Sequence, residues 1–470
     1  MSTTREAPPG PWDVLVIGAG LSGLTTASIL AHEGLRVLVV EGHVVPGGFT
    51  HTFSRGPFTW DVGVHSVGRI DGWEGGLLSR IGFGAWTATE DDRVEFPWGR
   101  RTLGGGPGRW IDAVDELATE AWQQFSIRTR GVRRGGDPRT TAEFLADLDL
   151  SPEERAQVTA RWAYLGEVPQ RSSAVAHALM GSSFQAGNHY PAGGAGQIAP
   201  TLIRGLVKRG GACLVGARVQ EIVLEGTRRG VRVGDRVIEA EVVVSALGVR
   251  TPALLAPAHR NRPWARALEA LPRSVGHVAL YVGLDRHPAG ASTANVWVHN
   301  RWPAERAVWD PRVEERPQAI YASFPALKAG DGAPTATLVA FVPDDLFGRR
   351  GEAYRAMKER VTSALLHELR RQFPDLEPVH VELSTPRTTT RFLGAPAAYG
   401  PAAVPARYLE PHLRPATGVR GLVLAGSDLV LGSVMGAVAG GALASVEVLG
   451  PGSADRWLAR PGPRPPGHRS

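Results

Sequence analysis

Residues 13–41 contain the feature that most restricts how this chain of 470 residues can fold. Asp13-Val-Leu-Val-Ile-Gly18 is typical of a fully buried parallel strand, residues 23–32 of a helix, and Arg36-Val-Leu-Val-Val-Glu41 of a second strand. This order within about thirty residues matches one βαβ unit. The pattern predicts an α/β fold whose nucleotide-binding domain is Rossmann-like, with a mostly parallel sheet.

The turn between the first strand and the helix fits the pattern G-x-G-x-x-G, with Gly18, Gly20 and Gly23 as its glycines. The first glycine permits the tight turn, the second lets a pyrophosphate approach the backbone, and the third lets the helix pack closely on the strand. Leu21 and Ser22 place their backbone amides at the helix N-terminus, which attracts phosphate. Glu41 ends the second strand, where a carboxylate can bind the ribose hydroxyls. These residues predict a dinucleotide site.

The rest of the chain suggests a domain built from separated pieces. Helices are expected at 152–165, 196–208 and 354–373, and strands at 212–224, 230–239, 241–246, 275–285 and 421–425. The pattern weakens between about 72 and 187, where loops are expected. We predict a nucleotide-binding domain from residues 11–70, 188–274 and 415–450, an inserted α+β substrate domain from 71–187 and 275–414, and a flexible tail at 451–470.

Composition excludes several classes of protein. Gly and Pro supply 58 and 36 residues without a collagen period, and 43% of the residues are hydrophobic, so a packed core is expected rather than disorder or a fibre. The net charge of +6 is carried almost entirely by arginine. The arginine clusters at 128–139 and 456–469 lack interleaved aromatic residues, so no nucleic-acid partner is expected. Weak contact with a membrane surface stays open.

Cysteine content and apolar segments bear on location. Cys213 is the only cysteine, so no internal disulfide and no thiolate metal cluster is expected. The first residues have no apolar signal region, which favours a cytoplasmic protein, with peripheral membrane contact left open. Residues 429–446 carry no charge, but four glycines among them favour a buried helix over a membrane span.

Further sequence blocks resemble those of a known family. They are, in chain order, Pro46-Gly47-Gly48, His51-Thr-Phe53, Asp61-Val-Gly63-Val-His65, Tyr190-Pro-Ala-Gly193-Gly194, Ala217-Arg-Val219, Ser384-Thr-Pro386 with Tyr399-Gly400, and Leu424-Ala-Gly426-Ser-Asp428 with Met435-Gly436. This series resembles the flavin amine oxidase superfamily, and within it the family of FAD-dependent phytoene desaturases, carotenoid isomerases and all-trans-retinol saturases. The acidic segment before residue 152 lacks the extra glycines and prolines of desaturases, which favours the saturase branch.

The resemblance implies roles for the matching residues. The cofactor would be FAD, with Gly47 and Gly48 close to the pyrophosphate and flavin, and with Val219 touching the adenine through its backbone. In the closing block, Gly426 and Asp428 would hold the ribitol or pyrophosphate. The helix that contains Met435 would point its N-terminus at the isoalloxazine, where reduced flavin is negative.

Two histidines are the candidates for proton handling. Transfer of a hydride to a C=C bond requires a proton at the other carbon, and His51 or His65 could supply it near neutral pH. The alternative is that both orient loops through hydrogen bonds. Asp61 fits a loop anchor better than a base. No metal site is expected, because the chain contains no HExxH motif.

The leading interpretation is an FAD-dependent oxidoreductase that acts on C–C or C=C bonds of a lipophilic polyene, as saturase, desaturase or isomerase. One alternative is a flavin amine oxidase, which ranks lower because no Phe, Trp or Tyr lies between Tyr408 and Trp457 to stand beside the flavin. Another is a non-catalytic isoprenoid-lipid carrier of the same fold. The chain has one dinucleotide fingerprint, so the electron donor or acceptor stays open.

Overall fold

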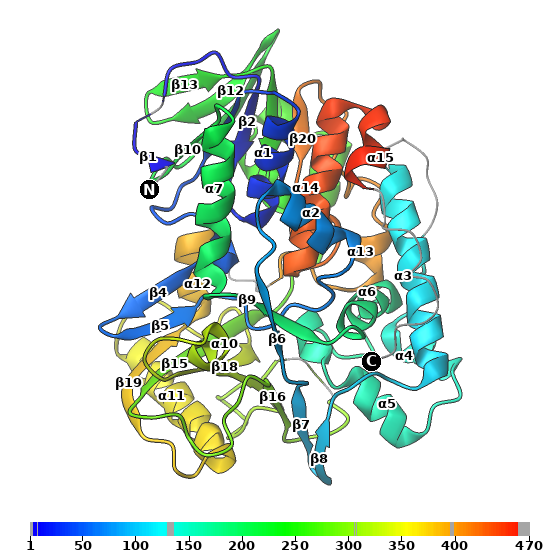
Figure 1. The fold of residues 1–470 in the computed structure, drawn as a ribbon, viewed down its shortest axis with the longest axis vertical. Coiled ribbons are helices and arrows are strands. Elements are labelled where there is room, and N and C mark those ends of the chain that lie inside the picture. Colours follow the sequence, from blue (N-terminus) through cyan, green and yellow to red (C-terminus); the bar gives the residue numbers. More distant parts are fainter. Residues whose placement is uncertain are drawn as a thin grey trace.

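Two β-sheets lie one above the other along the length of the molecule (Figure 1). The computed structural model describes residues 3–6, 8–128, 136–304, 306, 308–394 and 399–458. The upper sheet has six strands in the order β1-β10-β3-β2-β14-β20, and the lower sheet has seven in the order β19-β15-β18-β17-β16-β7-β8. The functional cavity is lined by strands of the lower sheet and by the loops that follow the strands of the upper sheet.

The upper sheet is parallel throughout, which confirms the Rossmann-like prediction. Its central strands are apolar and fully enclosed, as expected for a parallel sheet that is covered on both faces. Its strands come from three separated parts of the chain: β1 (Thr3–Thr4), β2 (Val14–Ile17), β3 (Val37–Val40), β10 (Ala212–Leu214), β14 (Val242–Ser245) and β20 (Leu422–Leu424).

Helices α1 (Leu21–His32) and α14 (Val434–Leu449) pack against each other beside this sheet, with α7 (Ile198–Lys208) along α1 (Figure 1). Small residues make the close approach of α1 and α14 possible, since a side chain at Gly441 would meet the carbonyl oxygen of Ser22 at 2.5 Å. Within the described residues, no helix has both the length and the apolar character needed to cross a bilayer. The uncharged segment 429–446 is thus largely the buried helix α14.

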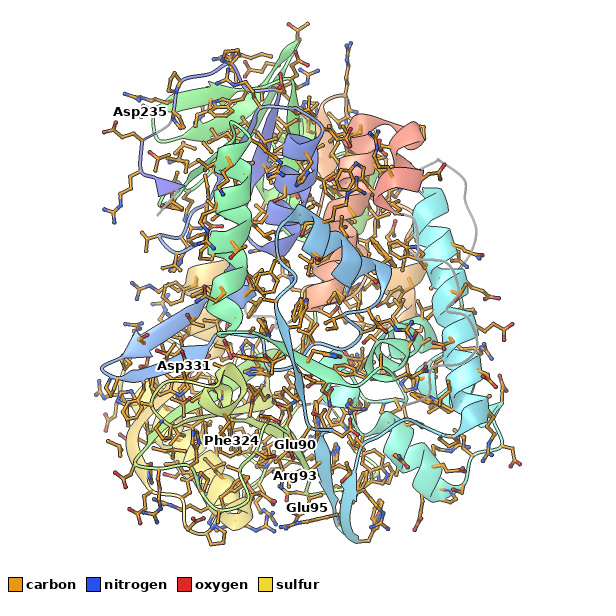
Figure 2. The ribbon with its side chains drawn as sticks, in the orientation of Figure 1. Glu90, Arg93, Glu95, Asp235, Phe324 and Asp331 are labelled. Carbon is orange, nitrogen blue, oxygen red and sulfur yellow. The ribbon has the colours of Figure 1, made fainter. Side chains whose placement is uncertain are left out.

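The lower sheet is antiparallel except for the parallel pair β16–β7. Helix α11 (Glu352–Gln372) packs on it, and Phe324 lies between them (Figure 2), with its ring centroid 5.0 Å from that of Phe373. The strands are β7 (Arg93–Phe96), β8 (Gly99–Thr102), β15 (Gly276–Leu284), β16 (Val296–His299), β17 (Ala319–Ser323), β18 (Thr335–Val342) and β19 (Pro378–Ser384).

Strand β15 corrects one expectation. Residues 275–285 alternate in the way that is typical of a half-buried strand, whereas all residues of β15 are buried. One face, with Val278 and Leu280, packs in the core that α11 covers. The other face, with Ala279 and Tyr281, packs against Trp60, which belongs to the hairpin of β4 (Thr52–Arg55) and β5 (Phe58–Asp61).

The segment 72–187, expected to be loop-rich, is largely helical. It contains α2 (Trp73–Ile81), α3 (Gly108–Arg128), α4 (Thr141–Ala146), α5 (Pro152–Thr159) and α6 (Ala174–Phe184), together with β6 (Trp86–Thr89), which pairs with β9 (Asn188–Pro191). Ser151 and Glu154 form a capping box at the start of α5, which was predicted over 152–165 but ends at Thr159, where a 3-10 turn follows. Helix α6 is buried on nearly every side, so it lacks the amphipathic period by which helices are recognised.

The start of the expected flexible tail is folded. Residues 451–457 form a 3-10 turn and the short helix α15 (Ala454–Trp457). Trp457 is 3% exposed, its indole N–H donates to Glu33 at 2.8 Å, and the Arg80 guanidinium lies 3.8 Å from its ring centroid. Residues 459–470, with most of the second arginine cluster, lie outside the described part of the chain, as do residues 129–135 of the first.

The antiparallel sheet of β11 (Glu221–Glu225), β12 (Arg228–Val233) and β13 (Arg236–Glu239) lies against the upper sheet, at its end away from the lower sheet (Figure 1). The remaining elements are the short helices α8 (Pro257–Arg260), α9 (Pro263–Ala270), α10 (Pro325–Ala329), α12 (Pro386–Leu393) and α13 (Pro405–Leu409).

Candidate functional site

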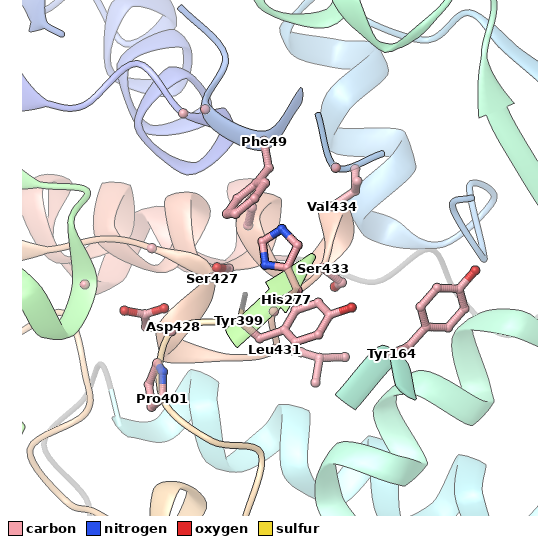
Figure 3. A pocket seen from close by; sticks show the side chains of 18 of the residues that line it. Phe49, Tyr164, His277, Tyr399, Pro401, Ser427, Asp428, Leu431, Ser433 and Val434 are labelled. Atoms are coloured by element: carbon pink, nitrogen blue, oxygen red, sulfur yellow. The ribbon is translucent and has the colours of Figure 1, made fainter. Parts of the chain in front are cut away.

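A cavity of about 570 Å³ lies where the carboxyl ends of the upper strands face the lower sheet (Figure 3). Ligands of open α/β sheets bind at this edge. Seven of the predicted cofactor residues and one predicted catalytic residue line the cavity: Gly20, Leu21, Ser22, Gly47, Gly48, Gly426, Asp428 and His65. Gly18, Gly23, Glu41, His51, Val219 and Met435 do not line it.

The fingerprint loop has the geometry that its glycines predict. Gly18 has φ +98°, which favours glycine, and a Cβ on Gly23 would collide with the carbonyl oxygen of Gly18. Helix α1 then begins at Leu21 with no side-chain cap and no acidic residue in its first turn. Its N-terminal amides and positive dipole end are therefore available to an anion in the cavity.

Glu41 is held at the end of β3 by backbone amides. The N–H of Ala19 and the N–H of His43 each donate to its carboxylate at 2.7 Å. The Ala217 N–H donates to the Glu41 carbonyl at 2.8 Å, so the segment that contains Val219 lies beside Glu41. That segment was expected to be strand, but residues 215–220 connect β10 to β11 without regular structure.

Gly47 and Gly48 form a tight loop against the fingerprint. They have φ +122° and +57°, and the Gly47 N–H donates to the Ala19 carbonyl at 2.8 Å. A Cβ on Gly48 would lie 3.2 Å from the Gly20 Cα, so the Gly48 backbone lies close against the fingerprint loop. His51 Nδ1 donates to the Gly48 carbonyl, which supports a loop-orienting contact for this histidine.

The closing block surrounds Asp428 with backbone. The Val249 N–H donates to Asp428 Oδ2 at 3.0 Å, and side chains at Gly248 or Gly400 would collide with its carboxylate. Burial raises the pKa of Asp428. Ser433 caps α14 through the Gly436 N–H at 2.9 Å and lines the cavity with Val434, whereas Met435 points elsewhere.

Arg407 joins two loops of this wall and was not predicted. It is 1% exposed, and its guanidinium donates to the carbonyls of Pro401, Ser427 and Asp428 at 3.0–3.1 Å. One buried cation thus holds the Pro401 loop against the closing block. No local signal marked it, because its partners lie 6 to 21 residues away in irregular segments.

Two neutral histidines line the cavity. Burial, with the charge of Lys328 and with His277 nearby, lowers the pKa of His65 to about 3. Burial lowers the pKa of His277, on β15, to about 4. In the described part of the chain the Nδ1 atoms of both are enclosed without a hydrogen-bond partner. His277 was not predicted, and its ring centroid lies 6.4 Å from that of Phe49 (Figure 3).

A buried polar cluster supports the His65 loop. Lys328 Nζ donates to the His65 carbonyl at 2.6 Å, to Ser323 Oγ at 2.8 Å and to Asn295 Oδ1. Burial lowers the pKa of Lys328 to about 8. Asp61 accepts from the Tyr190 hydroxyl, and burial raises the pKa of Asp61 to about 7. Asp61 therefore lies in the wall as an anchor, outside the cavity lining.

The far wall of the cavity is aromatic. Its residues come from elements whose contact with one another was not predicted from the sequence. The Tyr164 and Tyr321 hydroxyls are 3.3 Å apart, and the Trp297 ring centroid lies 4.6 Å from those of both tyrosines. Tyr399, in a block quoted above, also lines the cavity. The aromatic wall consists of Tyr164, Phe184, Trp297, Tyr321, Phe341 and Tyr399.

These observations fit a flavin dinucleotide. The uncapped α1 terminus and the glycine loops leave the backbone open to a pyrophosphate, with Glu41 beyond one end and Asp428 at the other. The partly buried guanidinium of Arg250 also lines the cavity, and an anion there would balance its charge. Arg250 was not predicted, but the sequence could have indicated it. It follows the predicted strand at 241–246, and residues at that end of a parallel strand lie at the ligand-binding edge.

Two family profiles match the chain. The profile described as flavin containing amine oxidoreductase matches residues 116–449, and that described as an NAD(P)-binding Rossmann-like domain matches residues 16–70. The second covers the fingerprint and Glu41. The first covers more than half of the chain, including the closing block.

Similar proteins were found by sequence and by structure. All-trans-retinol 13,14-reductase of Danio rerio is 26% identical over 92% of this chain and 85% of its own length. Prolycopene isomerase of Arabidopsis thaliana is 23% identical over 85% of this chain and 76% of its own length. The structure of cyclohexylamine oxidase from Brevibacterium oxydans has a TM-score of 0.61 at 19% identity, covers 94% of this chain and 100% of that chain, and shows the shared fold.

Proposed function

We propose that this chain, which belongs to the family of flavin-containing amine oxidoreductases, acts on a carbon–carbon bond of a lipophilic polyene. Its cofactor is FAD, which when bound supplies hydride transfer to or from carbon. The proposal covers saturation, desaturation and isomerisation. It draws its substrate class from the relatives named as a retinol reductase and a prolycopene isomerase.

One observation carries the proposal: a single cavity joins the cofactor-binding edge to the aromatic wall. The side chains of that wall are held by contacts with one another, so they present a fixed apolar surface. A conjugated chain packs well on such rings, because aromatic surfaces bury large apolar area and favour offset stacking. The same wall excludes water from the reacting carbons.

The charges around the cavity favour an uncharged substrate over an ammonium ion. Its acidic lining residues, among those described, are Asp428 and Glu269. Asp428 accepts the Val249 N–H, and Glu269 pairs with Arg260 at 2.8 Å. Arg260 neutralises Glu269, and the raised pKa of Asp428 disfavours its charged form, so both carboxylates attract a cationic amine only weakly. Amine oxidases place aromatic residues beside the flavin. The C-terminal segment has none, but other elements bring aromatic residues to the cavity, so the test includes an amine.

His65 and His51 differ in what they can do for the reaction. We propose that His65, in the cavity, works as a neutral imidazole that orients substrate or passes a proton through its Nε2. His51 lies outside the lining and holds the Gly48 loop. Burial also lowers the pKa of His51. A role in shaping the cofactor loop therefore suits it better than proton transfer.

The experiment is product analysis with the purified holoprotein. Reduced and oxidised samples are incubated without oxygen with all-trans-retinol, with prolycopene and with an aliphatic amine, and products are identified by mass and chromatography. A gain of two hydrogens indicates a saturase, a loss of two a desaturase, and an unchanged mass with altered retention an isomerase. Oxidation of the amine alone would contradict the proposal, as would a polyene that is bound but never altered, which would indicate a lipid carrier.

We also propose peripheral contact with the cytoplasmic face of a membrane, which would deliver a lipophilic substrate. The exposed apolar side chains Val44, Val45 and Phe392 support this, with exposed fractions of 59%, 41% and 45%. His43 contacts Phe392 at 5.2 Å between ring centroids, so the loop after β3 and the end of α12 form one patch beside Arg391. Flotation with anionic vesicles should recover the protein, and replacing all three side chains with serine should abolish recovery. Equal recovery of the variant would contradict this assignment.

A further inference from the structure

Arg250 lies at a position where a ligand charge is expected. It belongs to the 3-10 segment Gly248–Leu254, which follows directly on the central strand β14. Its side chain lines the cavity at the carboxyl edge of the parallel sheet, on the same edge as the fingerprint loop. Side chains at this edge contact the ligands of open α/β sheets.

The guanidinium of Arg250 is only partly buried in the cavity wall, and within the described ranges it has no hydrogen bond or ion pair. Burial lowers its pKa, although the carboxylates of Asp428 and Glu41 act in the opposite direction. Arginine nevertheless stays protonated in proteins, so a positive charge without a direct partner faces the cavity. Another arginine of the lining, Arg260, is paired with Glu269 at 2.8 Å and exposed.

Two carboxylates define which part of the ligand meets this charge. Glu41 ends the strand that binds the adenosine ribose in this fold, and Asp428 belongs to the block at the flavin end. Both act electrostatically on Arg250, so its guanidinium lies within range of each. In a flavin dinucleotide, the diphosphate is the group between the ribose and the ribitol.

The loop around Arg250 fixes where its side chain points. The Val249 N–H is bonded to Asp428 Oδ2, and Gly248, with φ +55°, leaves no side chain between that loop and the carboxylate. On the opposite side, a Cβ on Gly394 would lie 3.2 Å from Arg250 Nη1. Gly394 has φ +78° and ends helix α12, so the backbone closes over the guanidinium without a competing side chain.

We propose that Arg250 binds the diphosphate of FAD and supplies the positive charge that this site needs. The assignment rests on the family's cofactor and is independent of the proposed polyene substrate. Charge-assisted hydrogen bonds to phosphate are stronger than neutral ones, and removing one partner leaves the other unpaired. The glycine loops then shape the cofactor site, and Arg250 adds to the positive potential of the α1 N-terminus, which favours a phosphorylated flavin.

The test is equilibrium binding to the full chain stripped of flavin. In Arg250→Gln we expect the dissociation constants of FAD and ADP to rise about 10–100-fold, and that of riboflavin to change less than twofold. The salt dependence of FAD binding should also weaken. Arg250→Lys should recover part of the affinity because it keeps the charge. The matched control is Arg266→Gln, an exposed arginine outside the cavity lining, which should bind FAD as the unaltered chain does.

Two results would overturn the proposal. Unchanged FAD binding in Arg250→Gln would mean that the guanidinium serves another anion. Equal weakening of FAD, ADP and riboflavin, with an altered circular dichroism spectrum, would mean that Arg250 only holds the fold. Because none of these readouts is turnover, a failure of the polyene proposal leaves the result intact.

Discussion

At the residue scale, the central contact is between Lys328 and the loop of His65. Lys328 fills its three donor positions with His65, Ser323 and Asn295, so its ammonium is satisfied although it is 3% exposed. The bond to the His65 backbone fixes where the imidazole enters the cavity. The same charge disfavours a second positive charge on His65.

Replacing Lys328 with Met tests this contact. We expect unfolding free energy to fall by about 2–4 kcal/mol, because three buried acceptors lose a charged donor. The pKa of His65 should rise but stay below 6.5, because burial is the larger cause of its shift. Urea unfolding and NMR titration of the histidines measure both effects. A His65 that titrates near 6.5 in the unaltered protein would contradict the assignment.

Arg407 allows a second test at this scale. Arg407→Met removes the donor shared by the carbonyls of Pro401, Ser427 and Asp428. We expect a loss of about 2–4 kcal/mol in unfolding free energy and weaker FAD retention, since the closing block loses its attachment. Arg391→Met, at an exposed position, is the matched control and should change neither value. A loss of stability with full FAD retention would show that the two loops are positioned independently.

Part of the site was predictable from residues close in sequence. Gly18, Gly20, Gly23 and Glu41 interact across short spans, and their spacing alone predicts the dinucleotide geometry that the structure contains. The Lys328–His65 contact joins residues 263 positions apart, and no pattern in the sequence links them. His65 was therefore identified as a candidate, while the cause of its neutral state was not.

At the element scale, the packing of α1 on α14 sets the shape of the cofactor edge. Gly441 on α14 lies against the backbone of α1 at Ser22 and against Thr25. Ser22 is also in the cavity lining, so a shift between these helices is transmitted to the site. Both helices were predicted from their uncharged, glycine-containing segments, but their mutual contact requires the sheet that places their ends together.

Gly441→Ala should therefore cost about 1–3 kcal/mol in unfolding free energy and weaken FAD binding, because rigid backbone cannot make room for a methyl group. Gly76→Ala in helix α2 is the matched control, since no atom lies within 4 Å of the added Cβ. The control should stabilise the protein by up to about 1 kcal/mol. Thermal unfolding and FAD titration compare the two variants, and a neutral Gly441→Ala would contradict the close helix contact.

The elements of the lower layer were predicted less well for a physical reason. Strands β16, β17 and β18 form the aromatic wall with residues from the segment 163–184, and their pairing depends on long-range contacts. Helix α6 is buried among apolar neighbours and lacks a clear polar face, whereas α3 exposes Asp112, Glu116 and Glu120 and had a helical period that was missed. Local periodicity therefore predicted the strands of the upper sheet, but it did not predict which residues form the aromatic wall.

At the scale of the whole molecule, four buried histidines couple stability to pH. Burial lowers the pKa of His65 to about 3 and those of His177, His277 and His299 to about 4, below the ordinary value of 6.5. In the unfolded chain these groups bind protons first. Stability is therefore highest above pH 6.5 and falls as the pH drops toward 4.

Asp61 changes the proton balance in the opposite direction. Because its pKa is raised, the folded state binds one proton between pH 7 and 3.8 that the unfolded state does not. We expect a net uptake of about three protons on unfolding near pH 5, or about 4 kcal/mol per pH unit. His177→Gln should reduce the uptake by about one proton, whereas the exposed His367→Gln should not. Urea unfolding from pH 4.5 to 7.5 measures the slope, and equal slopes for both variants would contradict the buried neutral state.

The central claim is that one cavity brings the flavin and a polyene together, and rapid mixing without oxygen tests it most directly. Holoprotein in the oxidised and in the reduced state is mixed with the polyene, while flavin and polyene absorbance are followed through a single turnover. The account predicts that the polyene spectrum changes in at least one of the two flavin states, at a rate that rises with holoprotein concentration. A polyene spectrum unchanged in both states would contradict it.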